Sequence, residues 1–312
     1  MEETIIPQDQ DARFARARCS LEGLSVGDAF GERFFHQPDL TDPSIATRML
    51  PPPPWSYTDD TQMALSIVSI LRQHGTIEQD CLAESFAERY DPSRGYGPSM
   101  HRLLRSLRAG DPWQEAALNQ FSGQGSFGNG AAMRVTPLGA YFADSMDDVV
   151  QEASKSAQVT HTHPEAIAGS IAVAVAAAWA WCLNSAHESP DRATFLDLIL
   201  PFIPTSEVRR KVRWARDLSP ASIEAVVTLL GNGTGLSAQD TVPFVLWCAG
   251  ECVDNYEQAL WLTASGFGDV DTTCAMVGGI VSLFCGVDSI PQAWKQAREP
   301  LPNWPFLDAY RP

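Results

Sequence analysis

The chain has 312 residues, of which 45% are hydrophobic and 19% are charged, and its formal net charge is -16. This composition excludes a disordered chain, because it supplies enough apolar side chains for a large core. It also disfavours general binding to DNA or RNA, which requires clustered lysine and arginine against the phosphates. We therefore expect no general nucleic-acid affinity.

Apolar residues recur at helical spacing along most of the chain. The pattern predicts helices within residues 11–35, 61–75, 77–90, 147–160, 164–183, 206–218, 220–231, 241–252, 255–266 and 272–286. Gly75 ends the second segment, as a C-terminal glycine should. No alternating strand of useful length is visible. The sequence thus predicts an all-α fold, a single compact orthogonal multi-helix domain over residues 1–312 with about a dozen helices.

One predicted helix has the appearance of a membrane span. Residues 166–183, AIAGSIAVAVAAAWAWCL, are apolar throughout and about as long as the shortest spanning helix. A central helix of an all-helical protein looks the same, because it is apolar on every side. We favour the buried helix, since nothing else in the chain indicates a bilayer.

The cysteines give no sign of a disulfide framework. There are seven of them, and Cys248 and Cys252 are four residues apart, which does not match the usual zinc spacings. Reduced thiols are the simplest interpretation. The first twenty residues lack an apolar signal core. We expect a cytoplasmic monomer with no membrane association.

The longest irregular stretch, residues 36–57, contains the four consecutive prolines Pro51–Pro54. Consecutive prolines impose a stiff, extended path. Such a path would fix the following Thr-Asp-Asp-Thr turn in space, but the same stretch also suits an ordinary surface connector. Both interpretations stay open.

Three further stretches are predicted to be loops between helices, namely DPSRGYGPS (91–99), SFGNGAAMRVTPLG (126–139) and VTHTHPEAIAG (159–169). Their glycines would let backbone N–H groups approach a diphosphate, although one such loop alone is more often only a turn. His161 and His163 precede a helix. Their two-residue spacing lacks the further ligands that zinc needs, so a packing or ligand-contacting role is favoured.

Two predicted helices begin with clustered carboxylates and hydroxyls. The clusters are Thr58, Asp59, Asp60 and Thr61 at one helix and Asp269, Asp271, Thr272 and Thr273 at the other. Such residues cap helices, because they accept hydrogen bonds from the unpaired N–H groups. However, one acid is enough for a cap, and additional carboxylates repel one another unless a cation lies among them. All the candidate ligands are oxygens, which suit Mg²⁺ or Mn²⁺ first and Ca²⁺ next, and together they could hold two ions.

Seven motifs occur in the order seen in one family. They are GLSVGDAFGE, YTDDTQMALSI, RGYGP, GNGAAMRVTPLG, VTHTHPEAIAG, GNGTGLSAQDTVPFVLW and GFGDVDTTCAMVGGIVSLFCG. From about residue 20 to residue 286 the chain resembles the ADP-ribosylglycohydrolase family, which includes the dinitrogenase reductase-activating glycohydrolase and the human ADP-ribosyl-acceptor hydrolases. The resemblance implies an all-α fold, two Mg²⁺ or Mn²⁺ ions, and removal of ADP-ribose from a modified side chain or a related conjugate.

The resemblance also implies roles for individual residues. Metal ligands would be Thr58, Asp59 and Asp60 on one side and Asp269, Asp271 and Thr272 on the other. The ribose and diphosphate would contact Gly95, Tyr96, Gly97, Gly128, Asn129, Gly130, Ala131 and Met133, and His161 would lie near the diphosphate.

The chain departs from the family pattern at one catalytic position. Many members carry a glutamate eight residues after the glycine of the GDA motif, and here that position is Phe35, with Glu32 three residues earlier. On a helix the two positions are neighbours on one face. Our hypothesis is that Glu32 or Asp60 moves the proton. The alternative is a catalytically weak or inactive module that binds ADP-ribose or an ADP-ribosylated protein, such as an immunity protein against an ADP-ribosylating toxin.

Overall fold

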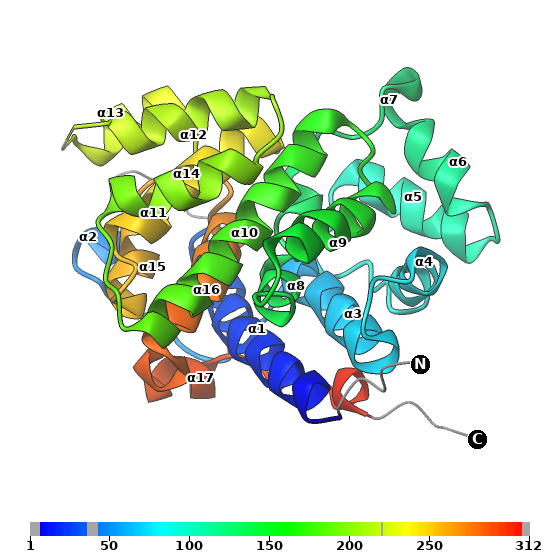
Figure 1. Cartoon of the computed structure of the whole chain (residues 1–312), viewed down its shortest axis with the longest axis horizontal. Coiled ribbons are helices and arrows are strands. Elements are labelled where there is room, and N and C mark those ends of the chain that lie inside the picture. Colours follow the sequence, from blue (N-terminus) through cyan, green and yellow to red (C-terminus); the bar gives the residue numbers. More distant parts are fainter. Residues whose placement is uncertain (1–6, 36–42, 220, 308–312) are drawn as a thin grey trace, which may run out of the picture.

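The computed structural model describes residues 7–35, 43–219 and 221–307, and these residues form helices and connecting loops (Figure 1). The α-helices are α1 (Pro7–Phe35), α2 (Pro43–Ala46), α3 (Asp59–His74), α4 (Gln79–Glu88), α5 (Pro98–Arg108), α6 (Trp113–Leu118), α7 (Gln120–Gly123), α8 (Thr136–Tyr141), α9 (Met146–Gln158), α10 (Pro164–Ala186), α11 (Arg192–Ile199), α12 (Glu207–Asp217), α13 (Ile223–Leu230), α14 (Ala238–Glu251), α15 (Tyr256–Ala264), α16 (Val270–Cys285) and α17 (Gln292–Ala297). Short 3-10 helices are η1 (Asn129–Ala131), η2 (Leu200–Phe202), η3 (Val287–Ser289) and η4 (Trp304–Phe306). Extended pairing within the described ranges is limited to two isolated bridges. The all-α prediction is confirmed.

The predicted segments each contain a helix, and Gly75 ends α3 in the left-handed conformation with its N–H donating to the Leu71 carbonyl. Sequence reasoning missed mainly short helices, such as α6, α8 and α17. It also missed α5, whose buried Met100, Leu103 and Leu104 lie among arginines. Short helices were missed because two turns or fewer carry too few apolar positions to establish a period.

Helices α1 and α16 cross at the centre of the molecule in unusually close contact (Figure 1). Gly23, Gly27 and Gly31 form the contact stripe on α1. A Cβ atom at these positions would lie 2.1 Å from Ser282 Oγ, 2.2 Å from the Cys274 carbonyl oxygen and 2.4 Å from the Val270 carbonyl oxygen, respectively. Only glycine permits this approach. It brings the C-terminal part of α1, around Gly31, against the N-terminus of α16, where the second acidic cluster begins.

Helix α10 occupies the interior beside α16, and α8, α9 and α14 also pack against it. It is long and apolar enough to cross a membrane, and 78% of its most apolar window is buried inside the protein. Its alanines allow close packing on all sides. The prediction that this segment is a buried core helix agrees with this placement.

The segment that enters α3 is anchored by aromatic packing. Trp55 is 1% exposed and lies against Phe30 of α1 and Trp294 of α17. Its backbone N–H donates to the Ala297 carbonyl at 2.7 Å, and the Tyr57 N–H donates to Glu299 Oε1 at 2.9 Å. Residues 51–57 are therefore a fixed approach to the acidic turn. Residues 36–42 of the same predicted stretch lie outside the described residues.

Candidate functional site

The N-terminus of α3 is capped by a carboxylate from another helix. Asp28 of α1 accepts hydrogen bonds from the backbone N–H groups of Thr58 at 3.0 Å and Thr61 at 3.1 Å, and from the Thr61 hydroxyl at 2.5 Å. Thr58, at the N-cap position, makes no side-chain cap. Because Asp28 satisfies these amides, the side chains of Thr58, Asp59 and Asp60 are not needed as caps.

The two acidic clusters meet around Asp60. Its Oδ2 atom lies 2.9 Å from the Thr58 hydroxyl and 3.4 Å from the hydroxyl of Thr272, on α16. Its Oδ1 atom is buried and has no hydrogen-bond partner among the described residues. Asp269, at the N-cap position of α16, likewise makes no side-chain cap. The ends of α3 and α16 thus form one site, as the metal-site interpretation requires.

Burial and mutual repulsion raise the pKa values of these carboxyl groups. Burial, opposed by hydrogen bonds from Thr61 and Thr58, raises the pKa of Asp28 to about 7. The pKa values of Asp59, Asp60 and Asp269 lie well above the usual range, first because of burial and then because neighbouring aspartates repel the charge. A cation among these groups would relieve both effects.

The residues present fit a hard divalent cation. Carboxylates and threonine hydroxyls are the oxygen donors that Mg²⁺ and Mn²⁺ prefer, and Asp60 Oδ1 is a buried acceptor without a donor. In the described part of the chain, no three acidic, histidine or cysteine side chains are already arranged to hold a metal. Binding would therefore have to draw the carboxylates together, replacing hydroxyl contacts such as that between Thr58 and Asp60.

The RGYG loop lies directly beside the first cluster. The Asp59 N–H donates to the Arg94 carbonyl at 2.7 Å, and a Cβ atom at Gly95 would lie 3.9 Å from Asp59 Oδ1. Gly95 has a φ of +84°, which glycine adopts without strain. Tyr96 is buried, and its pKa is raised by burial and by the Asp59 charge. Gly97 faces open space.

The GNG turn lies beside the second cluster. Asn129 Nδ2 donates to Asp269 Oδ2 at 2.6 Å and lies 3.1 Å from the Thr241 hydroxyl. The loop before α14 supports the same aspartate from another side, because the Asp269 N–H donates to the Asn232 carbonyl at 3.2 Å. Of the remaining predicted ligand contacts, Ala131 and Met133 are buried in the core.

His161 lies against the GNG turn with the ring edge formed by Nε2 and Cε1. A Cβ atom at Gly128 or Gly130 would lie 3.2 Å or 3.1 Å from this nitrogen. Burial, followed by the nearby Arg134 charge, lowers the pKa of His161 to about 3, so the ring is neutral at ordinary pH.

A hydrogen-bond chain selects one tautomer of the neutral His161 ring. Arg134 Nη2 donates to the Thr160 hydroxyl oxygen at 2.9 Å, and that oxygen lies 2.7 Å from His161 Nδ1. A guanidinium only donates, so the hydroxyl accepts from Arg134, and His161 Nδ1 is the one acceptor that the described residues offer to the hydroxyl proton. The ring proton therefore resides on Nε2, which becomes a donor at the glycine turn. Sequence reasoning missed Arg134 and Thr160.

This chain predicts the protonation behaviour of His161. We expect ¹⁵N NMR to find the Nε2–H tautomer and no titration of this ring between pH 5 and 8. Thr160→Ser should keep the tautomer, whereas Thr160→Val should lose the Nδ1 bond and give a tautomer mixture. Titration of His161 near pH 6.5 in the unaltered protein would contradict the assignment.

Glu32 is the carboxylate of α1 that lies closest in sequence to Phe35, the position at which the family pattern has a glutamate. Burial, with repulsion from Asp271 and Asp28, raises its pKa to about 7. Phe35, where the family pattern has glutamate, is 39% exposed. Glu32 therefore lies within the field of the acidic cluster, one helical turn beyond Asp28, and is half protonated near neutral pH.

Fold and site together define a class: an all-helical protein with an acidic cluster at two helix N-termini, flanked by glycine turns. The chain belongs to the ADP-ribosylglycohydrolase family, whose model matches residues 9–308. It is similar to human ADP-ribosylhydrolase ARH3, with 30% identity over 329 aligned positions covering 91% of this chain and 89% of that protein. An uncharacterized protein of Archaeoglobus fulgidus is 33% identical over 301 positions, covering 89% of each chain. A solved structure described as an ADP-ribosylglycohydrolase-related protein complex superposes with a TM-score of 0.67 at 25% identity, covering 93% of this chain and 94% of that one.

Proposed function

We propose that this protein is a metal-dependent hydrolase that removes ADP-ribose from a modified protein side chain or a related ADP-ribosyl conjugate. The observation that carries the proposal is the meeting of two acidic helix ends at Asp60, with the RGYG loop and the GNG turn directly beside them. Backbone N–H groups and a neutral histidine donor suit a diphosphate in a chain whose net charge is -16.

We assign the metal ligands to Thr58, Asp59 and Asp60 of α3 and to Asp269, Asp271 and Thr272 of α16. Mg²⁺ or Mn²⁺ held there would orient the ribose hydroxyls and acidify a bound water. Asp28 holds the first turn of α3 in place, and Asn129 orients Asp269. The GNG turn and His161 Nε2–H bind the diphosphate, which aligns the ribose C1″ with the acidic cluster.

Hydrolysis at C1″ passes through an oxocarbenium-like state and needs a group that moves a proton. Glu32 suits this task because its pKa of about 7 is close to the working pH. Asp60 is the other candidate, since its buried Oδ1 has no donor among the described residues.

Glu32→Gln tests the first assignment. We expect kcat to fall about 100-fold or more, because an amide cannot exchange the proton, while ADP-ribose binding stays within a few-fold. Glu88→Gln, an exposed change of the same chemistry, should retain full activity. A Glu32→Gln protein with normal kcat and normal folding would exclude Glu32 as the acid or base and leave Asp60.

Release of free ADP-ribose separates this function from the alternative of a binding module. We expect release from at least one member of a panel of arginine-linked and serine-linked peptides, modified nucleic-acid ends and O-acetyl-ADP-ribose, and only with Mg²⁺ or Mn²⁺ present. Binding to panel members without release would favour the binding module. The panel also identifies the linkage that is cut.

A further inference from the structure

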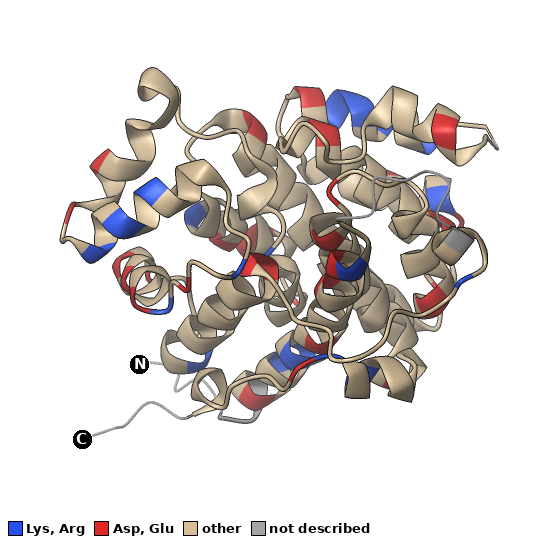
Figure 2. Cartoon of the chain, turned by 180° about the vertical axis from the view of Figure 1, so that it is seen from behind, with Lys and Arg blue, Asp and Glu red and all other residues tan. Residues whose placement is uncertain are grey.

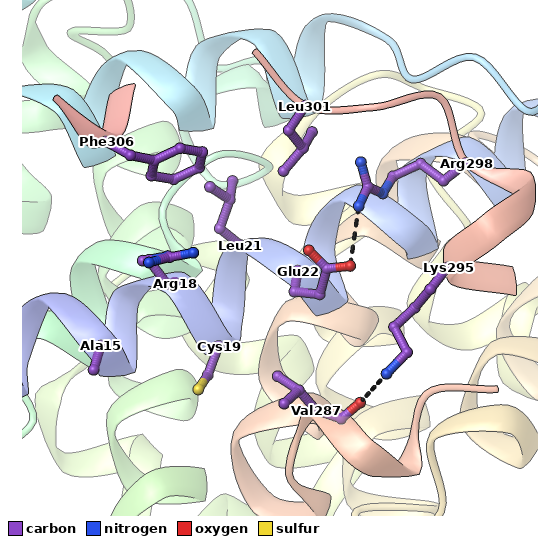
Figure 3. A pocket seen from close by; sticks show the side chains of 10 residues that line it. All are labelled: Ala15, Arg18, Cys19, Leu21, Glu22, Val287, Lys295, Arg298, Leu301 and Phe306. Atoms are coloured by element: carbon purple, nitrogen blue, oxygen red, sulfur yellow. Dashed lines mark hydrogen bonds and ion pairs between the residues drawn. The ribbon is translucent and has the colours of Figure 1, made fainter. Parts of the chain in front are cut away.

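A cavity lies along residues 15–22 of α1, which precede the part of α1 that contacts the acidic cluster, and it is bounded by η3, α17 and the segment that follows α17 (Figure 3). Its volume is about 540 Å³, within the range of small-molecule sites. The lining residues are Ala15, Arg18, Cys19, Leu21, Glu22, Val287, Lys295, Arg298, Leu301 and Phe306, and we call it the basic pocket. None of the acidic-cluster residues lines it.

The charge of the basic pocket is opposite to that of the protein. It carries three cationic side chains and one carboxylate, whereas the whole chain has a net charge of -16 and acidic side chains are spread over many of its helices (Figure 2). Burial raises the pKa of the Cys19 thiol, so this group adds no negative charge. A cleft lined by excess positive charge concentrates field lines and attracts anions.

Arg298 is the buried cation of the pocket, with a side chain only 8% exposed. One nitrogen pairs with Glu22 at 3.0 Å and another donates to the Glu299 carbonyl at 2.7 Å. Its Nε–H is buried and has no acceptor in the described part of the chain. A single carboxylate therefore neutralises this guanidinium while one of its donors lacks an acceptor.

The other two cations have no carboxylate of their own within the described ranges. Lys295 Nζ donates to the Val287 carbonyl at 3.0 Å, and Arg18 lies over the Phe306 ring, 5.0 Å from its centroid. Figure 3 shows Arg18 on one side of the pocket and Arg298 and Lys295 on the other, with Leu21, Leu301 and Phe306 between or above them. The pocket thus has positively charged side chains at its rim, Arg18 and Lys295, that no carboxylate neutralises within the described ranges, and it has an apolar wall.

We propose that the basic pocket binds a small organic anion, with one acidic group and an apolar body. The acidic group lies beside Arg298 and Lys295 and accepts the hydrogen bonds that they offer, and Arg18 on the opposite side adds to the positive potential of the pocket. The apolar body packs on Leu21, Leu301 and Phe306, which excludes water from the ion pairs. This site is separate from the acidic cluster and does not depend on the hydrolase function.

Two fluorescent probes with one ring skeleton test the proposal. They are 8-anilinonaphthalene-1-sulfonate, which carries an acidic group, and N-phenyl-1-naphthylamine, which does not. We expect the sulfonate to bind the folded protein saturably, one per chain, with an affinity that falls as NaCl is raised. The neutral probe should bind at least about tenfold more weakly.

Variants that weaken or strengthen binding of the sulfonate probe test whether it binds in the basic pocket. Arg18→Gln/Lys295→Gln should weaken its binding about five- to tenfold, since two rim charges are removed. Glu22→Gln should strengthen it several-fold, because Arg298 loses its competing carboxylate. Arg105→Gln, an exposed charge loss on α5, is the matched control and should leave it unchanged. Thermal melts verify that each variant is folded.

Three results would overturn the proposal. One is equal binding of the neutral and anionic probes, which would indicate an apolar cavity only. Another is unchanged sulfonate affinity in both the double variant and Glu22→Gln. The last is displacement of the sulfonate by ADP-ribose in direct competition, which would place the probe in the acidic site.

Discussion

Asp60→Asn is expected to abolish hydrolysis while making the metal-free protein more stable. Asp60 is fully buried, its pKa is raised by burial and by four other aspartates, and its Oδ1 atom has no donor among the described residues. Replacing the carboxyl group by an amide removes the free-energy cost of burying this charge, which is on the order of 1–3 kcal/mol and corresponds to about 2–6 °C in Tm. The same change removes a metal ligand and a candidate proton carrier, so kcat should fall on the order of 100- to 10,000-fold.

The two effects are measured on the same samples. Thermal melts in EDTA should show a higher Tm for Asp60→Asn, and titration with MgCl₂ should raise the Tm of the unaltered protein but hardly that of the variant. Asp254→Asn, an exposed change of the same chemistry, should behave as the unaltered protein does. A variant that keeps both its Mg²⁺ response and its activity would exclude Asp60 from the metal site.

The stability of the metal-free protein is expected to fall as pH rises from 5 to 8. The pKa of Asp28 is about 7 in the folded protein and 3.8 ordinarily, and that of Glu32 is about 7 against 4.5. The folded state therefore holds these protons more tightly than the unfolded chain does. Their contribution to stability is fully present below the unfolded pKa values and is lost as pH approaches 7. Asp59, Asp60 and Asp269 shift in the same direction.

Metal should counteract this loss, because a bound cation replaces the protons. In EDTA we expect Tm to fall by at least about 5 °C between pH 5 and 8, since two units of the Asp28 shift alone correspond to roughly 3 kcal/mol. With saturating MgCl₂ the fall should be much smaller. Asp144, whose pKa is lowered by its hydrogen bond with Arg16, contributes stability that is fully present above about pH 4 and is lost only below it, outside this window. A Tm that is flat or rising in EDTA would contradict the linkage.

Much of this protein was predictable from local sequence patterns. Apolar spacing identified the long helices, since a helix of three or more turns repeats its period often enough to be recognised. The excess of carboxylates at Asp59–Asp60 and Asp269–Asp271 indicated a cation, because like charges repel whatever the fold. The ordered motifs indicated the family, which the match over residues 9–308 confirms.

Other features depend on which residues the fold brings together. Asp28 and Thr58 are 30 residues apart, so no local sequence pattern indicates that a side chain of α1 caps α3. Because of this cap, the side chains of Asp59 and Asp60 are not needed to cap the helix. The chain from Arg134 through Thr160 to His161 is likewise formed only by packing. Charge pairing in the basic pocket joins Glu22 to Arg298, 276 residues away. Sequence alone determined which chemical groups are present, whereas the tertiary structure decided their neighbours, and neighbours set their pKa values and their roles.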